Sequence, residues 1–241
     1  MQKFAGKIVL ITGATSGLGS ALAHRFAQEG AHLILLGRDT EKLEALDDAL
    51  SSYPEIDVTL VPVDLKDIQR LQNLGVSLAP KYPSIDVVIG NAGMLGTLTP
   101  MPHQDPKVWQ EVLDVNLTAN FHLIKALDPL VKDSTHPRWI FVTSGVASKG
   151  LPYWGAYGVS KAALEEMVKI YAHEMESSPT RVNLVDPGMM ATKLLKQAMP
   201  GKDLSQIPAP ETMTDIFVHL ASEDCQETGQ LFKARDFAQA S

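Results

Sequence analysis

Short apolar segments alternate with longer amphipathic segments along most of this chain. The apolar segments predict strands of four to six residues at 7–12, 32–36, 58–63, 86–89, 139–143 and 181–185. Between them, apolar residues recur at helical spacing, which predicts helices at 17–29, 39–52, around 66–79, 106–131 and 155–176. Strands that are separated by helices are joined by crossover connections, so the sheet is expected to be parallel.

A parallel sheet is covered by helices on both faces, which explains why these strands are apolar throughout. The chain has 241 residues, 45% of them hydrophobic, which is enough for one large core. We therefore expect a single α/β domain over residues 1–241. Its sheet should be Rossmann-type and doubly wound, with about seven strands in three α/β/α layers. Residues 189–210, rich in Met, Lys and Pro, are predicted to form a mobile lid over a substrate.

Composition excludes several kinds of partner. The formal net charge is −7, whereas nucleic acids and anionic membranes require a basic face. The seven histidines form no HExxH motif or Cys/His cluster, so no metal site is expected. No apolar run approaches the roughly 20 residues that span a bilayer. The first strand is expected near residue 7, which leaves no room for a signal peptide ahead of it. The single cysteine, Cys225, cannot form an internal disulfide, and we expect a cytoplasmic protein.

A glycine-rich turn lies between the first expected strand and the first expected helix. Its sequence is Thr12-Gly13-Ala14-Thr15-Ser16-Gly17-Leu18-Gly19. Glycines permit a tight turn and let a phosphate approach the backbone, and the helix N-terminus offers it unpaired N–H groups. The spacing is GxxxGxG rather than GxGxxG, and an ordinary left-handed turn is the alternative. The strand–turn–helix context favours a dinucleotide-binding turn.

The end of the second expected strand indicates which dinucleotide binds. An acidic residue there would bind the ribose 2′-hydroxyl of NAD, but this position holds Gly37, followed by Arg38. A guanidinium can pair with a 2′-phosphate, so we predict NADP(H). Two alternatives remain: Arg38 is a solvated turn residue, or Asp39 turns inward and binds NAD. Asp64, after the third strand, is expected to accept a hydrogen bond from adenine, to cap the next helix, or both.

Three side chains form a candidate constellation for proton transfer. Tyr157 and Lys161 lie four residues apart on one face of an expected helix. An ammonium about 4 Å from a phenolate attracts it by about 4 kcal/mol at an effective dielectric near 20, before desolvation is subtracted. That attraction would lower the tyrosine pKa from about 10 towards neutrality. Ser144 ends a strand at the carboxyl edge of the sheet and could hold a substrate oxygen; its alternative role is that of a turn or cap residue.

Motifs in a fixed order along nearly the whole chain match a known family: the glycine turn 12–19, Asp64, Asn91-Ala92-Gly93, Asn116, Ser144, Tyr157 with Lys161, and Pro187-Gly188 with Thr192. In order and spacing this set resembles the short-chain dehydrogenase/reductase family. Residues 91–121 and 154–161 are most similar to a bacterial branch of oxidoreductases that are named only for their reaction class.

The resemblance implies a role for each matching residue. Tyr157 would be the general acid/base, and Lys161 would lower its pKa and bind the nicotinamide ribose. Ser144 would orient the substrate carbonyl. Asn116 would hold a water in a proton relay to Lys161; alternatively, it is a helix-bending polar residue that is satisfied locally. The residues implied at the cofactor are Gly13, Thr15, Ser16, Gly17, Leu18, Gly19, Arg38, Asp64, Leu65, Asn91, Ala92, Gly93, Tyr157, Lys161, Pro187, Gly188 and Thr192.

The chain departs from the family pattern in three places. Gly90 stands where the family usually has the first Asn of an NNAG motif, so a side-chain hydrogen bond is lost there. The DGG motif common near the C-terminus is missing, which puts the usual tetramer contact in doubt. The glycine turn also lacks the basic residue that many NADP-binding members carry.

The substrate is expected to be a small molecule in an apolar pocket. Candidate walls are Met94, Leu95, Leu151, Trp154, Met189 and Met190, which suit a hydrophobic ketone, aldehyde or diketone; these residues could equally be core or lid packing. We predict an NADP(H)-dependent carbonyl reductase. The alternatives are an NAD-dependent alcohol or sugar dehydrogenase and an inactive NADP-binding sensor or scaffold. Apolar stripes on the helices from residues 106 and 155, which the family pairs across a two-fold axis, predict a homodimer or homotetramer.

Overall fold

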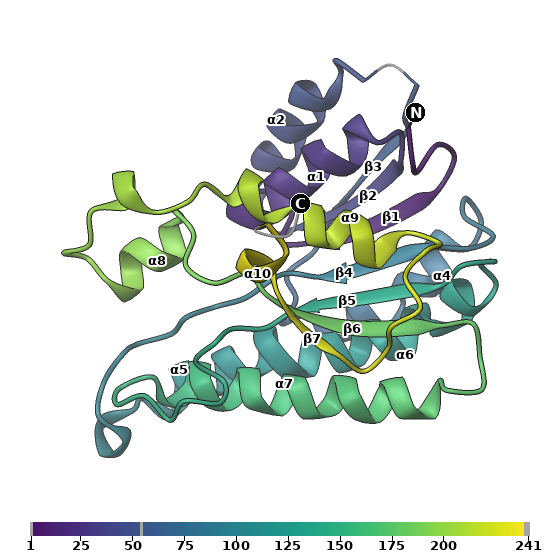
Figure 1. The fold of residues 1–241 in the computed structure, drawn as a ribbon. Coiled ribbons are helices and arrows are strands. Elements are labelled where there is room, and N and C mark those ends of the chain that lie inside the picture. Colours follow the sequence, from purple (N-terminus) through teal and green to yellow (C-terminus); the bar gives the residue numbers. More distant parts are fainter. Residues whose placement is uncertain (1, 54, 239–241) are drawn as a thin grey trace.

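The computed structural model describes residues 2–53 and 55–238 and confirms the expected fold class (Figure 1). One parallel seven-stranded sheet has the strand order β3-β2-β1-β4-β5-β6-β7. The strands are β1 (Ile8–Thr12), β2 (His32–Gly37), β3 (Val58–Pro62), β4 (Val87–Gly90), β5 (Arg138–Val142), β6 (Arg181–Asp186) and β7 (Leu231–Lys233).

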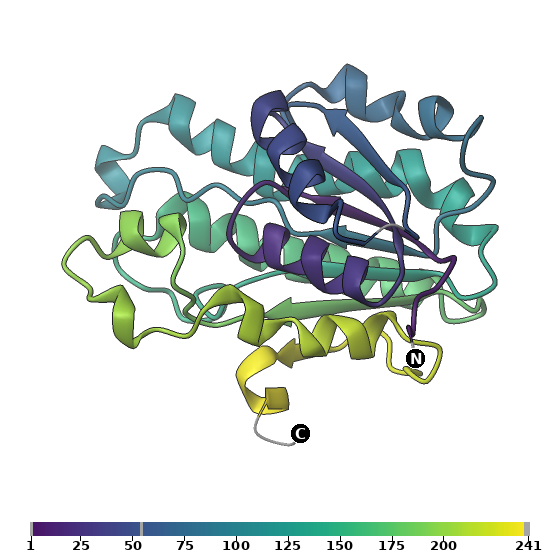
Figure 2. The same cartoon turned by 90° about the horizontal axis from the view of Figure 1, so that it is seen from above.

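Helices cover both faces of this sheet, as Figures 1 and 2 show. The α-helices are α1 (Gly17–Gln28), α2 (Thr40–Leu50), α3 (Ile68–Gln72), α4 (Leu74–Leu78), α5 (Pro106–Leu113), α6 (Ala119–Lys132), α7 (Gly155–Glu174), α8 (Lys193–Ala198), α9 (Asp215–Ala221) and α10 (Ala234–Ala238). A π-turn, η2 (Asp114–Thr118), joins α5 to α6. Three 3₁₀ turns are η1 (Met101–His103), η3 (Leu204–Gln206) and η4 (Pro210–Met213).

Two hydrophobic cores lie on opposite faces of the sheet. Along β1, Val9 and Ile11 belong to the core under α1, α2 and α9, whereas Leu10 belongs to the core under α3, α4, α6 and α7. This alternation follows from the two-residue period of a strand. Because both faces are buried, the central strands are apolar at most positions, which is the pattern seen in the sequence; Thr12 and Arg138 are buried polar exceptions.

Two expected helices are interrupted in the structure. The helix expected around 66–79 is two short helices, α3 and α4, which meet at Asn73. In α4 the backbone of Gly75 lies against α6 so closely that a Cβ there would be 2.0 Å from the Ala126 carbonyl oxygen. The helix expected over 106–131 is divided into α5 and α6 by the π-turn η2. The turn contains Asn116, whose side chain bonds the distant residues Met94 and Ser160, and hydrophobic spacing along one helix carries no information on such contacts.

The strand order places a crevice between β1 and β4. The chain leaves β1 towards β2 on one side, and leaves β4 towards β5 on the other. The loops after these two strands therefore diverge, and ligands of open α/β sheets bind at such a switch point. Loop 91–104 follows β4, and residues 189–210, which contain α8, extend from the body of the protein (Figure 1). The two ends of that segment are joined by a hydrogen bond from Ala191 N to Pro208 O.

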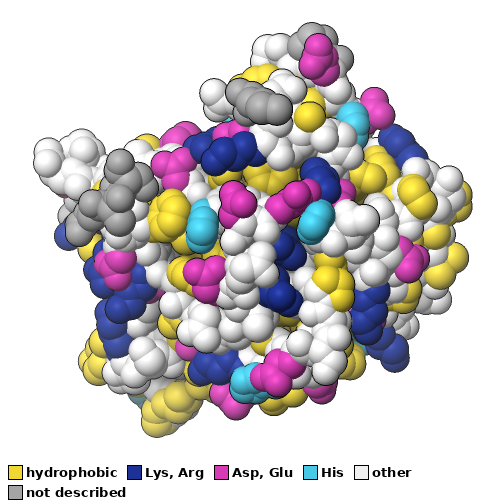
Figure 3. All heavy atoms as spheres, turned by 45° about the vertical axis from the view of Figure 1, so that its right-hand side comes forward, with side chains coloured by type: hydrophobic (Ala, Val, Ile, Leu, Met, Phe, Trp, Pro, Cys, Tyr) yellow, Lys and Arg dark blue, Asp and Glu magenta, His cyan; other side chains and the backbone are white. Residues whose placement is uncertain are grey.

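The surface carries charges of both signs. Figure 3 shows lysine and arginine side chains interspersed with acidic side chains over one face. None of the helices in the described ranges is long and apolar enough to cross a membrane.

Candidate active site

The glycine turn after β1 is shaped by two glycines that tolerate no side chain. Gly13 has a φ of +64°, and a Cβ there would be 2.9 Å from the Ala92 Cα. A Cβ on Gly19 would be 2.1 Å from the Gly13 carbonyl oxygen. The side chain of Ser16, which precedes α1, forms no capping hydrogen bond. The N–H groups of the first turn of α1 therefore remain available to an anion, and the turn fits a phosphate group.

Asn91 joins this turn to the end of β4. Its Nδ2 donates to the carbonyl oxygens of Thr12 at 2.9 Å and Gly13 at 3.3 Å. In return, the Thr12 hydroxyl accepts hydrogen bonds from the backbone N–H groups of Asn91 and Ala92, both at 3.0 Å. These bonds fix the floor of the crevice. Gly93 follows them, and the base of the 189–210 segment also reaches this turn, where Thr192 Cγ2 lies 3.2 Å from the Cβ position of Gly17.

At the end of β2, Arg38 and Asp39 have different surroundings. The Asp39 side chain caps α2 by accepting from Lys42 N at 3.2 Å, and it also pairs with the Lys42 ammonium. These contacts hold the pKa of Asp39 below its usual range. Arg38 is exposed and pairs with no other described residue. The carboxylate is therefore engaged on α2, and the guanidinium is free to bind a ligand.

Asp64 and Leu65 lie beyond the end of β3. Asp64 is half-buried and accepts a hydrogen bond from Lys66 N at 2.9 Å. It does not cap the next helix, because α3 is capped by Asp67, which accepts from Arg70 N. Leu65 packs against the core under α3 and α6. One carboxylate oxygen of Asp64 thus remains for a ligand.

Tyr157 and Lys161 share the buried face of α7. They are 7% and 2% exposed, and the Lys161 Nζ donates to the Val142 carbonyl oxygen at 2.7 Å. Burial lowers the pKa of Lys161 to about 8, while the Glu165 carboxylate acts in the opposite direction. Ser144, which follows β5, stands close enough to hydrogen-bond the phenol.

The pKa of Tyr157 is raised above its usual value, whereas from the sequence we expected Lys161 to lower it. Burial raises it, hydrogen bonding to Ser144 lowers it, and the Asp186 carboxylate raises it again. The Lys161 ammonium does not lower this pKa as expected, because it is directed at Val142 and lies 6.0 Å from the centre of the phenol ring. The phenol is therefore held protonated.

Asn116 lies in the π-turn η2 and is completely buried. Its Oδ1 accepts from Met94 N at 2.7 Å, and its Nδ2 donates to Met94 O and to the Ser160 hydroxyl, both at 2.9 Å. Its backbone carbonyl accepts from Asn120 Nδ2 at 2.8 Å. Each polar atom of the side chain therefore has a protein partner, and the backbone carbonyl oxygen, with one bond from Asn120, has a second lone pair that a water can occupy. A Cβ on Gly93 would lie 3.7 Å from Asn116 Oδ1 and 3.6 Å from Lys161 Nζ, so both groups border the same space.

The six expected wall residues have unequal exposure. Leu95 is buried, and Met190 packs against the core under α1 and α9. Leu151 and Met189 are 40% and 51% exposed, in the loops that follow β5 and β6. The Trp154 ring lies 5.9 Å from the Tyr157 ring, and Met94 is half-buried with its backbone held by Asn116.

Asp186 was missed in the sequence. It is the last residue of β6, buried at 9% exposure, and it precedes Pro187 and Gly188. Its Oδ1 accepts from Gly188 N at 2.9 Å, across a turn in which Gly188 has a φ of +72°. The available signal was a carboxylate at the end of an apolar strand, because such strands end at the ligand-binding edge of the sheet.

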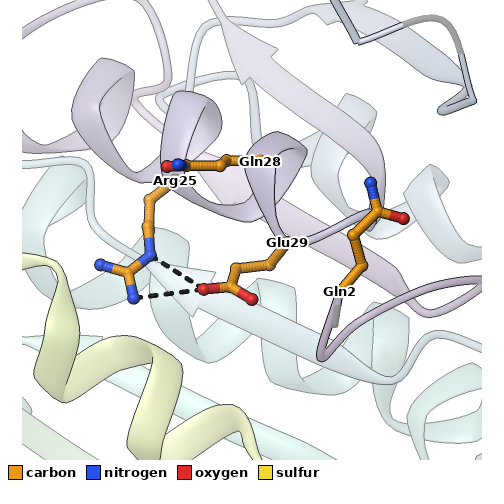
Figure 4. A pocket seen from close by; sticks show the side chains of 4 residues that line it. All are labelled: Gln2, Arg25, Gln28 and Glu29. Atoms are coloured by element: carbon orange, nitrogen blue, oxygen red, sulfur yellow. Dashed lines mark hydrogen bonds and ion pairs between the residues drawn. The ribbon is translucent and has the colours of Figure 1, made fainter.

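Two other clusters lie apart from this site. Figure 4 shows a shallow polar hollow lined by Gln2, Arg25, Gln28 and Glu29, at the end of α1 opposite to the glycine turn. The second cluster, His219, Cys225 and Glu227, is the one group in the described ranges whose ligand atoms lie within 4.8 Å of one another. Burial and Glu227 raise the pKa of Cys225 to about 11. The thiol donates to Glu227 Oε2 at 3.4 Å.

Comparison with known families decides the class of this protein. The family model described as short chain dehydrogenase matches residues 7–203. The chain belongs to the short-chain dehydrogenase family. Members of this family are dehydrogenases and reductases, so the chain is an oxidoreductase.

Individual relatives cover nearly all of this short-chain dehydrogenase. The uncharacterized oxidoreductase YciK of Escherichia coli K12 is 35% identical over 232 residues, which are 95% of this chain and 92% of YciK. The 3-oxoacyl-[acyl-carrier-protein] reductase FabG of Thermotoga maritima is 32% identical over 243 residues, covering 95% of this chain and 96% of FabG.

Solved structures agree with this assignment. A short chain dehydrogenase from Escherichia coli CFT073, complexed with NADPH, is 35% identical and has a TM-score of 0.94 over 97% of this chain and 98% of its own. A short chain dehydrogenase from Shigella flexneri, complexed with NADP, is 34% identical and also has a TM-score of 0.94, over 97% of this chain and 99% of its own.

Proposed function

We propose that this short-chain dehydrogenase reduces a ketone, aldehyde or diketone to an alcohol with NADPH. The observation that carries the proposal is the juxtaposition of Tyr157, Ser144 and Lys161 at the carboxyl edge of the sheet, beside a glycine turn that fits a phosphate. The phenol is held protonated there, which is the state that a proton donor to a carbonyl requires.

Each side chain has a distinct part in the reaction. When bound, NADPH would supply a hydride ion, which is one proton with two electrons, to the carbonyl carbon of the substrate. Tyr157 gives its phenolic proton to the carbonyl oxygen, so the C=O bond becomes a CH–OH group. Ser144 orients that oxygen through its hydroxyl. Lys161 binds the nicotinamide ribose and, once its ammonium turns from the Val142 carbonyl oxygen towards Tyr157, stabilises the phenolate that forms. The backbone carbonyl of Asn116 holds a water through which a proton returns.

We assign NADP(H) as the cofactor because the guanidinium of Arg38 is free to bind the 2′-phosphate. Asp39 is engaged with α2 and Lys42, so the NAD-binding alternative has no available carboxylate at this place. The similar proteins from Escherichia coli CFT073 and Shigella flexneri are complexed with NADPH and NADP. The groups assigned to the rest of the cofactor are the glycine turn, Asp64 and Leu65, residues 91–93, Pro187-Gly188 and Thr192.

The test of this function is a panel of ketones, aldehydes and diketones, in which NADPH consumption is followed by absorbance. We expect turnover of at least one hydrophobic member, because the Trp154 ring offers apolar surface 5.9 Å from the phenol ring, and Leu151 and Met189 are exposed apolar side chains. NADPH binding with no turnover of any member would instead support an inactive sensor or scaffold. We propose that the reaction takes place in the cytoplasm.

We also propose that the protein is a homodimer at least. Three large apolar side chains are exposed on neighbouring helices: Phe121 on α6 is 50% exposed, and Val159 and Ile170 on α7 are 43% and 53% exposed. Light scattering at micromolar concentration should give a dimeric or tetrameric mass, and Ile170→Glu should shift it towards a monomer. The matched control is Val76→Glu on α4, which is 77% exposed and should leave the mass unchanged. A monomeric mass for the unaltered protein contradicts the proposal.

A further inference from the structure

Asp186 lies against the wall of the proposed active site. A Cβ on Gly145, the residue after Ser144, would be 2.9 Å from Asp186 Oδ2 and 3.6 Å from Lys149 Nζ. A buried carboxylate thus stands on one side of Gly145, with an exposed ammonium nearby. No ion pair joins the two groups, nor does Asp186 form one with any other residue of the described ranges.

The negative charge of Asp186 acts electrostatically on the reacting groups. It raises the pKa of Tyr157, a phenol that is itself 7% exposed. Two charges in a partly buried site interact over several ångströms because little water screens them. A charged group on a substrate whose carbonyl meets Tyr157 therefore interacts with the same carboxylate.

The turn after β6 does not require this charge. Asp186 Oδ1 accepts from Gly188 N at 2.9 Å, and an asparagine side-chain oxygen would accept the same bond. Asp186 Oδ2 accepts no hydrogen bond from the described residues. Asp186 Oδ2 is not one of the enclosed, unpaired polar atoms of the described residues, so a donor on a bound ligand can reach it. A hydrogen bond to a carboxylate is stronger than one between neutral groups.

We propose that Asp186 forms a substrate subsite for a hydrogen-bond donor, an ammonium or a hydroxyl group, next to the reacting carbonyl. The same carboxylate disfavours carbonyl compounds that carry a carboxylate at that place. This inference rests on the proposed carbonyl reduction and narrows it to a substrate class. The carbonyl oxygen meets Ser144 and Tyr157, and the donor on the neighbouring carbon reaches Oδ2.

Four phenyl ketones that differ in one substituent test the subsite. Phenacylamine carries an ammonium beside the carbonyl, phenacyl alcohol a hydroxyl, benzoylformate a carboxylate and propiophenone a methyl group. Each kcat/KM is divided by the value for propiophenone with the same protein. We expect Asp186→Asn to lower the relative value for phenacylamine and raise that for benzoylformate by about tenfold each. The ratio of the two should therefore fall about 100-fold.

Lys149→Met is the matched control. It removes a charge of the opposite sign beside the same Gly145, so it should raise the phenacylamine-to-benzoylformate ratio rather than lower it. Both variants are compared with the unaltered protein for melting temperature and cofactor affinity. A phenacylamine-to-benzoylformate ratio that Asp186→Asn leaves unchanged overturns the subsite, while reduction of propiophenone by the same protein leaves the proposed function standing. Phenacyl alcohol distinguishes a neutral donor from a cation, because its response should be smaller than that of phenacylamine.

A failure of the proposed carbonyl reduction is distinguished from a failure of the subsite by a binding measurement. If none of the four ketones is reduced, binding of phenacylamine and benzoylformate to the protein with NADP⁺ is measured by ligand-observed NMR. Preferential binding of phenacylamine that Asp186→Asn abolishes supports the subsite without the reaction. Equal binding of the two ligands to both proteins overturns it.

Discussion

Replacement of Tyr157 with phenylalanine is expected to lower kcat by about a hundredfold to ten-thousandfold, the usual contribution of a positioned general acid. The variant lacks only the hydroxyl, so its ring still fills the buried position on α7 and still packs near Trp154. Cofactor affinity should therefore change little. Steady-state kinetics with a reactive carbonyl from the panel and a fluorescence titration with NADPH measure the two quantities.

Lys161→Ala provides the contrast for that experiment. We propose that this lysine both stabilises the phenolate and binds the nicotinamide ribose, so its loss should reduce kcat and weaken NADPH binding together. Near-normal turnover of Tyr157→Phe would show that another group donates the proton, and the proposed mechanism would be wrong. Loss of NADPH binding in Tyr157→Phe would indicate a folding or packing defect, which a melting temperature reveals.

The fold class could be predicted from the sequence because a strand buried on both faces appears directly as a run of apolar residues. A strand buried on both faces is apolar at its inner positions, as Ile8–Ile11 of β1 and Leu33–Leu36 of β2 are. The pattern could not specify β7, whose three residues are partly exposed at the sheet edge. It also could not divide the helix before Asn116, because the π-turn depends on contacts with the distant residues Met94 and Ser160.

The residues of the candidate site could be proposed from the sequence, but their pKa shifts could not. Short motifs locate Ser144, Tyr157 and Lys161, and the strand order places them at one edge. The pKa of Tyr157 depends instead on how deeply the phenol is buried and on which charges reach it, and these are properties of the folded protein. From the sequence, the Lys161 ammonium was expected to face the phenol, whereas in the structure it donates to the Val142 carbonyl oxygen. Asp186 escaped notice because its proximity to Gly145 and its electrostatic effect on Tyr157 join residues far apart in the chain.

Cofactor choice is expected to depend on Arg38. NADP differs from NAD by one phosphate on the adenosine ribose, and a charge-assisted hydrogen bond to it contributes about 1.5 to 3 kcal/mol. That corresponds to roughly a 10- to 150-fold preference in kcat/KM for NADPH over NADH. Arg38→Leu should abolish most of this preference. Because Arg38 is exposed, the preference of the unaltered protein should also weaken as salt increases.

Reversal of the preference requires a carboxylate at Gly37, and the structure shows what such a change must accommodate. A Cβ on Gly37 would lie 3.0 Å from Thr15 Cγ2 and 3.3 Å from a Leu43 methyl carbon. The backbone itself is no obstacle, since Gly37 is not among the glycines with positive φ. Gly37→Asp with Arg38→Leu should therefore be combined with Thr15→Ser, which removes the methyl group in closest contact.

The triple variant should prefer NADH, because the new carboxylate repels the 2′-phosphate and can accept from the ribose hydroxyls of NAD. Thr15→Ser alone is the control for the trimmed turn and should keep the NADPH preference of the unaltered protein. The measurement is kcat/KM for both cofactors with all three proteins at one ionic strength. Equal use of NADH and NADPH by the unaltered protein would mean that Arg38 does not bind the phosphate. Asp39, whose carboxylate would then have to leave Lys42 and the N-terminus of α2, becomes the residue to replace.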